Sequence, residues 1–399
     1  MTKREKEKGK ETAAPNADIC ADICIIGGGI AGLACAVFVR RLSPNASVVV
    51  LERGDINAGI DDGKSVVFNA RSAKYLIDAE CWDDNARPLH RVRAAFDGSN
   101  GVFDIGGKMA LGYGASHLQV RKNLAAKLQK ELISPAQVQH YDDANGKTTF
   151  AIGDKTNVVH SRMTVFACAS PLLPPGFRAR DYDYHQAAIA LTATAKNPPD
   201  GNAEYCALEQ FTGRGMVALV PRSDDKVGIV ICAPTASAGE VNALSDAALS
   251  KWLNKVFGGR LGLSICGKRA VYAPKLRHVY PLASGRTLCI GAGATQVHPA
   301  GAQGLNLAIQ DAKVFAECWR DNIDGDDNRY DAICQTYRRR RRKAHMATIA
   351  ATSTIAMAAK ICTAPPLAKL GGAAASILSA FVNLPPIKTS VISQISGSR

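Results

Sequence analysis

Three glycines near the start of the chain, Gly27, Gly29 and Gly32, have the spacing that suits a bound dinucleotide. The first permits a tight turn, the second lets the backbone approach a diphosphate, and the third lets a helix pack against a strand. Glu52 ends the next apolar run, where a carboxylate can accept hydrogen bonds from both hydroxyls of a ribose, and Arg53 follows it. We therefore predict that these five residues belong to a dinucleotide site.

The elements that would position these residues can be read from hydrophobic periodicity. The apolar run 19–26 predicts a buried strand, residues 30–42 repeat apolar side chains at helical spacing, and residues 47–51 predict a second strand. Strand, glycine turn, helix and strand form a βαβ unit, whose ligand binds at the carboxyl ends of the strands. This pattern alone does not separate FAD from NAD.

The middle of the chain has a different pattern. Residues 187–195, 216–221 and 226–232 are β-rich and separated by Asn, Pro, Asp and Gly, which predicts an antiparallel sheet. A buried strand at 286–291 and a helix at 305–319 then resume the nucleotide-binding layer. The predicted fold class is α/β, with a Rossmann-like domain on a parallel sheet, an inserted antiparallel sheet domain for the substrate, and C-terminal helices.

The predicted division of the chain has five parts. They are a disordered tail at 1–17, the first part of the nucleotide-binding domain with the start of the substrate region at 18–180, the substrate sheet domain at 181–280, the second part of the nucleotide-binding domain at 281–335, and a C-terminal helical region at 336–399.

Charge and composition limit the partners. The chain has 49 Lys+Arg against 35 Asp+Glu, a formal charge of +14, which favours anionic surfaces. The basic run 338–343 precedes uncharged stretches at 344–359 and 371–387, both shorter than the ~20 residues that span a membrane. An interfacial helix on anionic lipid and a simple buried helix both fit. No aromatic residues interleave with the basic run, so we expect no nucleic acid.

The cysteines and the first residues exclude two further classes. The 12 cysteines are dilute and show no C-x-x-C spacing, which predicts small buried side chains and no metal site. The charged first residues have no apolar core behind them, so we expect no secretory signal.

A second motif, GAGATQVHPAGAQGLN at 291–306, bears on the choice between FAD and NAD. It resembles the flavin-dependent aromatic hydroxylases, in particular the branch that hydroxylates the polyprenylated ring in ubiquinone biosynthesis. Further segments agree with this family in order: 63–82, 184–188, 208–221, Tyr337 with the arginine run, and 384–386.

The resemblance implies the fold of the p-hydroxybenzoate hydroxylase superfamily and FAD as cofactor. It implies hydroxylation of a polyprenyl phenol with O2 and with NAD(P)H or an electron-transfer protein as reductant. It further implies a ubiquinone-biosynthesis complex and an anionic membrane surface as partners, in the cytoplasm or on the matrix side of the inner mitochondrial membrane. By this resemblance the catalytic candidates are His298 and Pro299, and the further FAD-binding candidates are Arg121, Gly291, Ala292, Gln303, Gly304, Leu305 and Asn306. A packed or solvated histidine is the alternative for His298.

The chain also departs from this family. Ala292 and Cys168 stand where relatives carry Asp, Thr295 replaces a histidine and Ala302 a glycine. Leu118 stands where an arginine is expected before a helix at 120–132, although Arg121 follows one turn later. Each lost charge-assisted hydrogen bond costs about 1.5–3 kcal/mol, so we expect loosely held FAD that Ala292→Asp would tighten.

Two other functions are alternatives to the hydroxylase. One is a flavin-deficient, non-catalytic scaffold in the same assembly. The other, a nicotinamide-only dehydrogenase, leaves the segment 299–306 unexplained.

Overall fold

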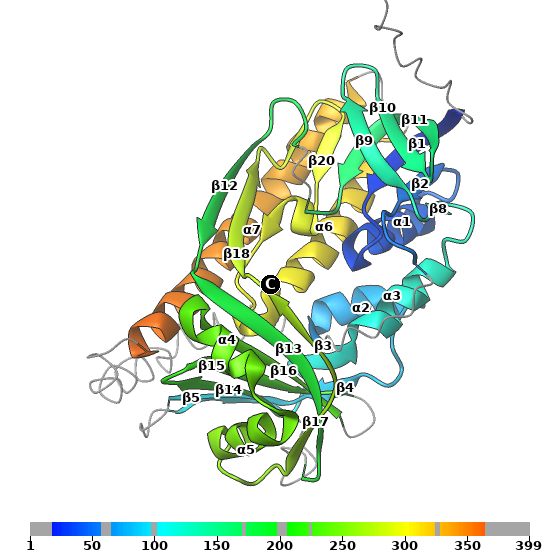
Figure 1. The fold of residues 1–399 in the computed structure, drawn as a ribbon. Helices are drawn as coiled ribbons and strands as arrows, with labels where there is room; N and C mark the ends of the chain where they lie inside the picture. The colour runs from blue at the N-terminus through cyan, green and yellow to red at the C-terminus, as the bar shows by residue number, and fades with distance from the viewer. Residues whose placement is uncertain are drawn as a thin grey trace, which may run out of the picture.

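The computed structural model describes residues 18–56, 65–96, 102–169, 173–197, 206–222, 226–323 and 328–363. Figure 1 shows two layers of sheet structure, with the N-terminal strands and the last helices in one and the middle of the chain in the other. The predicted tail at 1–17 and the stretch 371–387 lie outside the described residues.

The first layer is a largely parallel sheet in the order β19-β20-β11-β1-β2-β8, with β10 and β9 added at β11. β20, β11, β1, β2 and β8 run parallel to one another, as buried apolar strands joined by helices do, while β19 and β10 pair antiparallel with β20 and β11. The strands are β1 (Asp18–Ile26), β2 (Val48–Leu51), β8 (Leu132–Ile133), β9 (Gln137–Asp142), β10 (Lys147–Ile152), β11 (Lys155–Phe166), β19 (Ala283–Ser284) and β20 (Thr287–Cys289).

Three helices pack on this sheet. α1 (Ile30–Leu42) is buried over most of its length and lies against α6 (Gln303–Arg320), and α6 lies against the long α7 (Arg329–Thr363). Their shared core includes Leu33, Phe315 and Tyr337, none of which is measurably exposed. The turns Gly291–Gly293 (η1) and Ala300–Ala302 (η2) lead from β20 into α6.

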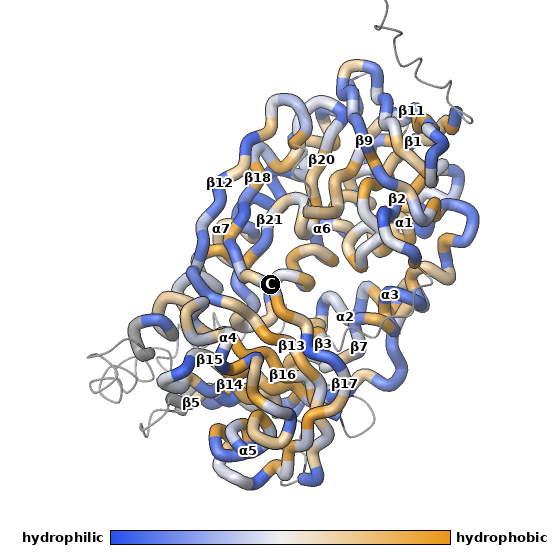
Figure 2. Tube along the Cα trace, in the orientation of Figure 1, coloured by the Kyte–Doolittle hydropathy of each residue, from blue (hydrophilic) through white to orange (hydrophobic). Residues whose placement is uncertain are grey.

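The second layer is a seven-stranded sheet in the order β17-β13-β16-β15-β14-β5-β6. Its neighbours are antiparallel except β14 and β5, which run parallel. Figure 2 shows the apolar residues of β13 and β16 within this layer, which form a core with α5. The elements are β5 (Arg91–Phe96), β6 (Val102–Gly106), β13 (Gln186–Ala195), β14 (Cys206–Thr212), β15 (Gly215–Pro221), β16 (Lys226–Pro234), α4 (Thr235–Ala243), α5 (Asp246–Val256) and β17 (Leu263–Tyr272).

Two small sheets and two helices complete the described structure. One sheet has the order β3-β7-β4 and the other β12-β18-β21. The elements are β3 (Ser65–Asn69), α2 (Ala70–Asp78), β4 (Arg87–Leu89), β7 (Gly112–Ser116), α3 (His117–Ala126), β12 (Arg178–Asp183), β18 (Lys275–Tyr280) and β21 (Thr295–Gln296).

The fold class predicted from the sequence is confirmed, two details differ, and the division into domains stays a prediction. The seven-stranded sheet takes β5 and β6 from the N-terminal part of the chain, because a parallel partner for β14 must come from a distant segment. The helix expected at 120–132 begins at His117 and ends at Ala126, capped by the Ser116 hydroxyl, which accepts from Gln119 N at 3.3 Å. The predicted boundaries at 180 and 280 fall within β12 and at the end of β18.

Candidate cofactor and active site

The glycine turn between β1 and α1 has the geometry that its spacing predicts. Gly27 has φ +115°, a conformation that side chains rarely adopt. A Cβ on Gly32 would lie 1.9 Å from the carbonyl oxygen of Gly27, so only glycine allows this close packing of helix and strand. A Cβ on Gly29 would meet nothing within 4 Å, and Gly29 is exposed at the N-terminus of α1. The turn thus offers open space and unpaired helix N–H groups to a phosphate.

Glu52 and Arg121 lie at this turn. Oε2 of Glu52 accepts a hydrogen bond from Gly28 N at 2.5 Å, and Oε1 accepts from Gly54 N at 2.9 Å. The Arg121 side chain donates to the Gly28 carbonyl at 3.1 Å and pairs with Glu52 at 3.6 Å. Each carboxylate oxygen retains a lone pair for a ribose hydroxyl. Arg121 therefore reaches the site from within α3, while Leu118 is half-buried and Arg53 is exposed on the following turn.

A second turn, η1, packs against the first turn of α1. A Cβ on Gly291, which has φ +53°, would lie 2.9 Å from the Ala31 Cβ. Asp311 of α6, which is not measurably exposed, accepts a hydrogen bond from Gly291 N at 3.1 Å. Ala292 is exposed in this turn. The turn that carries the missing family carboxylate is thus held in place by another carboxylate behind it.

Asp311 belongs to a buried polar network. Arg341 donates to Asp311 at 2.6 Å, and His345 Nε2 lies 2.9 Å from the same oxygen. Thr295 Oγ1 links His345 Nδ1 at 2.7 Å to His278 Nδ1 at 2.9 Å. Burial raises the pKa of Asp311, but His345 and Arg341 outweigh that effect and lower it below its ordinary value. The network fixes α7 against α6 and η1.

The sequence analysis missed Asp311 as a structural determinant of the site. A signal was present, because Asp311 is the one carboxylate on the face of α6 that carries the buried residues Leu307, Ala308 and Phe315. A carboxylate on such a face must have a partner when it is buried.

The segment before α6 is held by backbone and side-chain contacts. Asn306 accepts from Asn69 N at 2.8 Å and donates to Val67 O at 2.9 Å and Ala302 O at 3.0 Å, so its amide is committed to the protein. Ala302, where the family has glycine, adopts φ +51°. Gln303, Gly304 and Leu305 form the half-buried first turn of α6. These residues can offer backbone N–H groups to a ligand, whereas the Asn306 side chain positions the helix.

Two hydrogen bonds connect this segment to the seven-stranded sheet. His298 Nε2 lies 2.7 Å from Gln186 Oε1 of β13, and His298 Nδ1 accepts from Ala300 N at 3.2 Å. Glu209 of β14 accepts from Gly301 N at 3.1 Å. Burial lowers the pKa of His298 to about 4 and raises that of Glu209. With both ring nitrogens occupied, His298 in this structure is a neutral buried residue of the scaffold, and Pro299 leads into η2.

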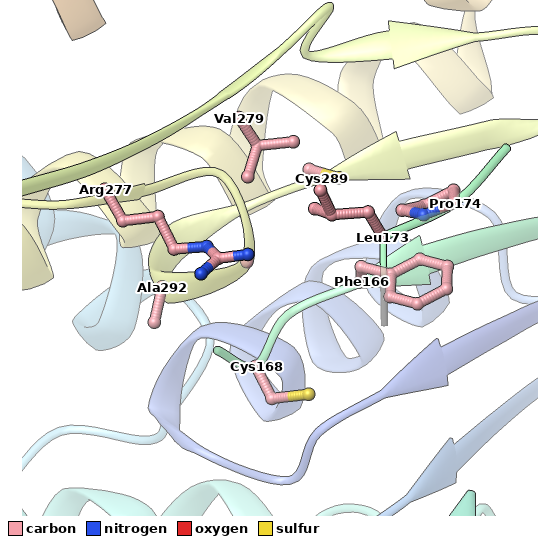
Figure 3. Close-up of a pocket in the computed structure, with 9 residues that line it drawn as sticks. Phe166, Cys168, Leu173, Pro174, Arg277, Val279, Cys289 and Ala292 are labelled. Carbon is pink, nitrogen blue, oxygen red and sulfur yellow. The ribbon is translucent and has the colours of Figure 1, made fainter. Parts of the chain in front are cut away.

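A small pocket lies at the carboxyl ends of β1, β11 and β20. The residues that line it include Cys168, Arg277, Ala292 and Gly293. Figure 3 shows the Arg277 guanidinium over the turn with Ala292, while Cys168 lies across the pocket. Burial, and secondarily Glu52, raise the pKa of the Cys168 thiol, which stays protonated at neutral pH. The two positions that lack the family carboxylates therefore lie in one pocket.

The described residues fit a dinucleotide such as FAD. The open space at Gly29, the N-terminus of α1, Glu52 and Arg121 converge at one edge of the parallel sheet. No group of His, Cys, Asp and Glu side chains in the described ranges could hold a metal ion. No helix within those ranges is long and apolar enough to cross a membrane.

Comparisons with known proteins agree with this geometry. A family model for a FAD binding domain matches residues 172–352, and one for FAD dependent oxidoreductases matches residues 22–170. The chain is 26% identical over 325 residues to the ubiquinone hydroxylase UbiL of Rhodospirillum rubrum, covering 76% of this chain and 73% of the relative. It is 20% identical over 395 residues to the mitochondrial ubiquinone biosynthesis monooxygenase COQ6 of Dictyostelium discoideum, covering 80% of each.

Solved structures show the same fold. The p-nitrophenol 4-monooxygenase PnpA of Pseudomonas putida superposes with a TM-score of 0.73 at 14% identity, covering 96% of this chain and 99% of that one. The flavin-dependent brominase Bmp2 superposes with a TM-score of 0.71 at 15% identity, covering 95% and 94%. The two FAD family models, which match different parts of the chain, and the two relatives show that the chain is similar to FAD-dependent oxidoreductases and to the hydroxylases of ubiquinone biosynthesis.

Proposed function

We propose that this protein is a FAD-dependent hydroxylase that inserts one oxygen atom into the ring of a polyprenylated phenol during ubiquinone biosynthesis. The observation that carries the proposal is the convergence of Gly29, Glu52 and Arg121 at the carboxyl ends of the parallel strands. The relatives UbiL and COQ6 support the substrate class.

In the proposed reaction the cofactor would supply the oxygen chemistry, and the protein would hold the cofactor and the substrate in position. FAD held here would supply the oxygen chemistry: with electrons from a nicotinamide or another donor and with O2, one oxygen atom would enter the ring and the other would leave as water. Glu52 and Arg121 hold the glycine turn, and the N-terminus of α1 would bind the diphosphate of the cofactor. The first turn of α6 presents N–H groups to negative charge, which the helix dipole stabilises.

The segment between η1 and α6 connects the parallel sheet to the seven-stranded sheet. Its contacts would set the position of a bound substrate relative to the cofactor. His298 and Glu209 tie it to β13 and β14, and Asn306 ties it to β3. A substrate bound on the seven-stranded sheet would therefore be fixed relative to α6 through these contacts. We expect their loss to loosen positioning rather than to abolish cofactor binding.

The membrane location is also part of the proposal. Within the basic run, Arg341 is buried against Asp311 and Arg340 pairs with Glu317, while Arg338, Arg339, Arg342 and Lys343 are exposed. Farther along α7, Met346 and Met357 are 51% and 45% exposed, whereas Thr352 and Ala356 are buried. One face of α7 thus packs on the protein and the other offers cations and methionines to anionic lipid, which suits a lipid-soluble substrate. The location would be the cytoplasmic face of a membrane, or the matrix face of the inner mitochondrial membrane.

The decisive experiment measures binding and turnover on the full chain. Equilibrium titration with FAD is followed by reductant-driven O2 consumption with a prenylated phenol, and mass spectrometry of the product tests for the gain of one oxygen atom. FAD binding with substrate-dependent product supports the proposal. A protein that binds no FAD at high micromolar concentration would be the non-catalytic scaffold.

A further inference from the structure

The pocket beside Ala292 is small and partly polar. It is enclosed by Cys168 after β11, by Cys289 at the end of β20, by Ala292 and Gly293 of η1, and by Arg277 and Val279 of β18. Its cavity volume is about 10 Å³, which holds one water-sized group. The described residues that line it include one cation, Arg277, and no carboxylate.

Strand geometry explains why Arg277 enters this pocket. Successive side chains of a strand point to opposite faces. In β18, Arg277 and Val279 face the pocket, whereas His278 faces Thr295 and the buried network on the other side. The Arg277 side chain is 17% exposed and pairs with the half-exposed Asp181 at 3.4 Å, a long ion pair that leaves other guanidinium N–H groups available.

The pocket borders the dinucleotide turn. A Cβ on Gly27 would lie 2.7 Å from the Cys168 Cβ, and η1 packs on α1 through Ala31. A phosphate bound at the N-terminus of α1 would therefore have the pocket of Arg277 beside it. A guanidinium binds phosphate oxygens strongly and with defined geometry.

We propose that Arg277 binds the diphosphate of the dinucleotide cofactor, with one phosphate oxygen entering the pocket between Ala292 and Cys168. This inference rests on the proposed FAD binding and concerns how the chain achieves it. A cation replaces the two missing carboxylates as the polar group of this pocket. The sequence-based expectation for Ala292→Asp is then reversed, because a new carboxylate would pair with Arg277 and repel the diphosphate.

The test is FAD titration of the full chain at low and high salt. Arg277→Ala should weaken FAD binding about tenfold to a hundredfold, the range for a hydrogen bond to a charged group. It should also reduce the salt dependence of binding. The FAD affinity of Arg277→Lys should lie between those of the wild type and Arg277→Ala, since lysine keeps the charge and loses the planar fork. Ala292→Asp should weaken binding severalfold.

Two control variants distinguish the loss of a direct contact with FAD from the loss of an ion pair within the protein or of one positive charge. Asp181→Asn removes the same ion pair and keeps the guanidinium, so FAD should bind as in the wild type or more tightly. Arg260→Ala removes an equal charge from an exposed position after α5 and should leave binding unchanged. Thermal unfolding of each apoprotein identifies any variant whose fold is damaged.

The outcomes are distinguishable. FAD binding by the wild type with no loss in Arg277→Ala, an equal loss in Asp181→Asn, or tighter binding by Ala292→Asp each overturns the role of Arg277 while the proposed function stands. A wild type that binds no FAD overturns both.

Discussion

Glu52→Ala tests how the dinucleotide turn is held. In the absence of structure, a carboxylate at a strand end is expected to contact only a ribose. In the fold, Glu52 accepts hydrogen bonds from Gly28 N and Gly54 N and pairs with Arg121. The substitution should therefore lower the free energy of unfolding of the apoprotein as well as the affinity for FAD.

The magnitude follows from these contacts. A hydrogen bond to a charged group contributes about 1.5–3 kcal/mol. Gly54 is exposed and its N–H can return to water, so most of the loss should come from Gly28, which is buried. The ion pair with Arg121, at 3.6 Å with both side chains about one-fifth exposed, adds at most about 1 kcal/mol. We expect a total loss of about 2–4 kcal/mol.

The assay is urea unfolding of the apoprotein, followed by FAD titration. Glu52→Gln serves as the matched control, because it keeps one acceptor oxygen and should lose about half as much stability. Arg121→Met should weaken FAD binding with less effect on stability. If Glu52→Ala unfolds at the wild-type urea concentration, then the carboxylate does not hold the turn and the reasoning fails.

Three further predictions concern the rest of the chain. Ala302→Gly should raise the free energy of unfolding by about 0.5–1 kcal/mol, because the left-handed φ of +51° strains alanine; an unchanged urea midpoint would contradict it. Asp311→Asn should lower the free energy of unfolding by about 3–5 kcal/mol at pH 7, because Arg341 and His345 lose their buried partner. Since the pKa of Asp311 is lowered from 3.8, its contribution is present above pH 3.8 and is lost as the pH falls through the lower folded pKa, so the difference between variant and wild type should narrow in acid. Replacing the exposed residues Arg338, Arg339, Arg342 and Lys343 by Gln should weaken the free energy of binding to anionic vesicles, measured by co-sedimentation, by about 1 kcal/mol per residue. The loss should be larger at low salt than at high salt. Equal binding of the wild type to anionic and neutral vesicles would favour α7 as a purely structural helix.

Local sequence determined the dinucleotide turn and much of the architecture. The glycine spacing requires the close contact of Gly32 with Gly27, and the helix predicted at 30–42 has those bounds in α1. The strands of the middle region also follow from local pattern, with β13, β15 and β16 found within two residues of their expected ends. Such features depend on the period of apolar residues and on backbone conformations that only neighbours in sequence control.

Tertiary structure decided what the polar residues do. His298, Asn306 and Glu52 were predicted as ligand contacts, and the fold gives each of them partners in the protein, because packing brought Gln186, Asn69 and Gly28 within hydrogen-bond distance. Arg341 belonged to a basic run, yet the helical turn of α7 directs it to the buried Asp311 while its neighbours face solvent. Arg277 had no motif around it, and it entered the site because β18 crosses the carboxyl ends of strands far away in sequence. Periodicity predicts which face of an element is buried, but the partner that a buried charge meets depends on the assembled layers.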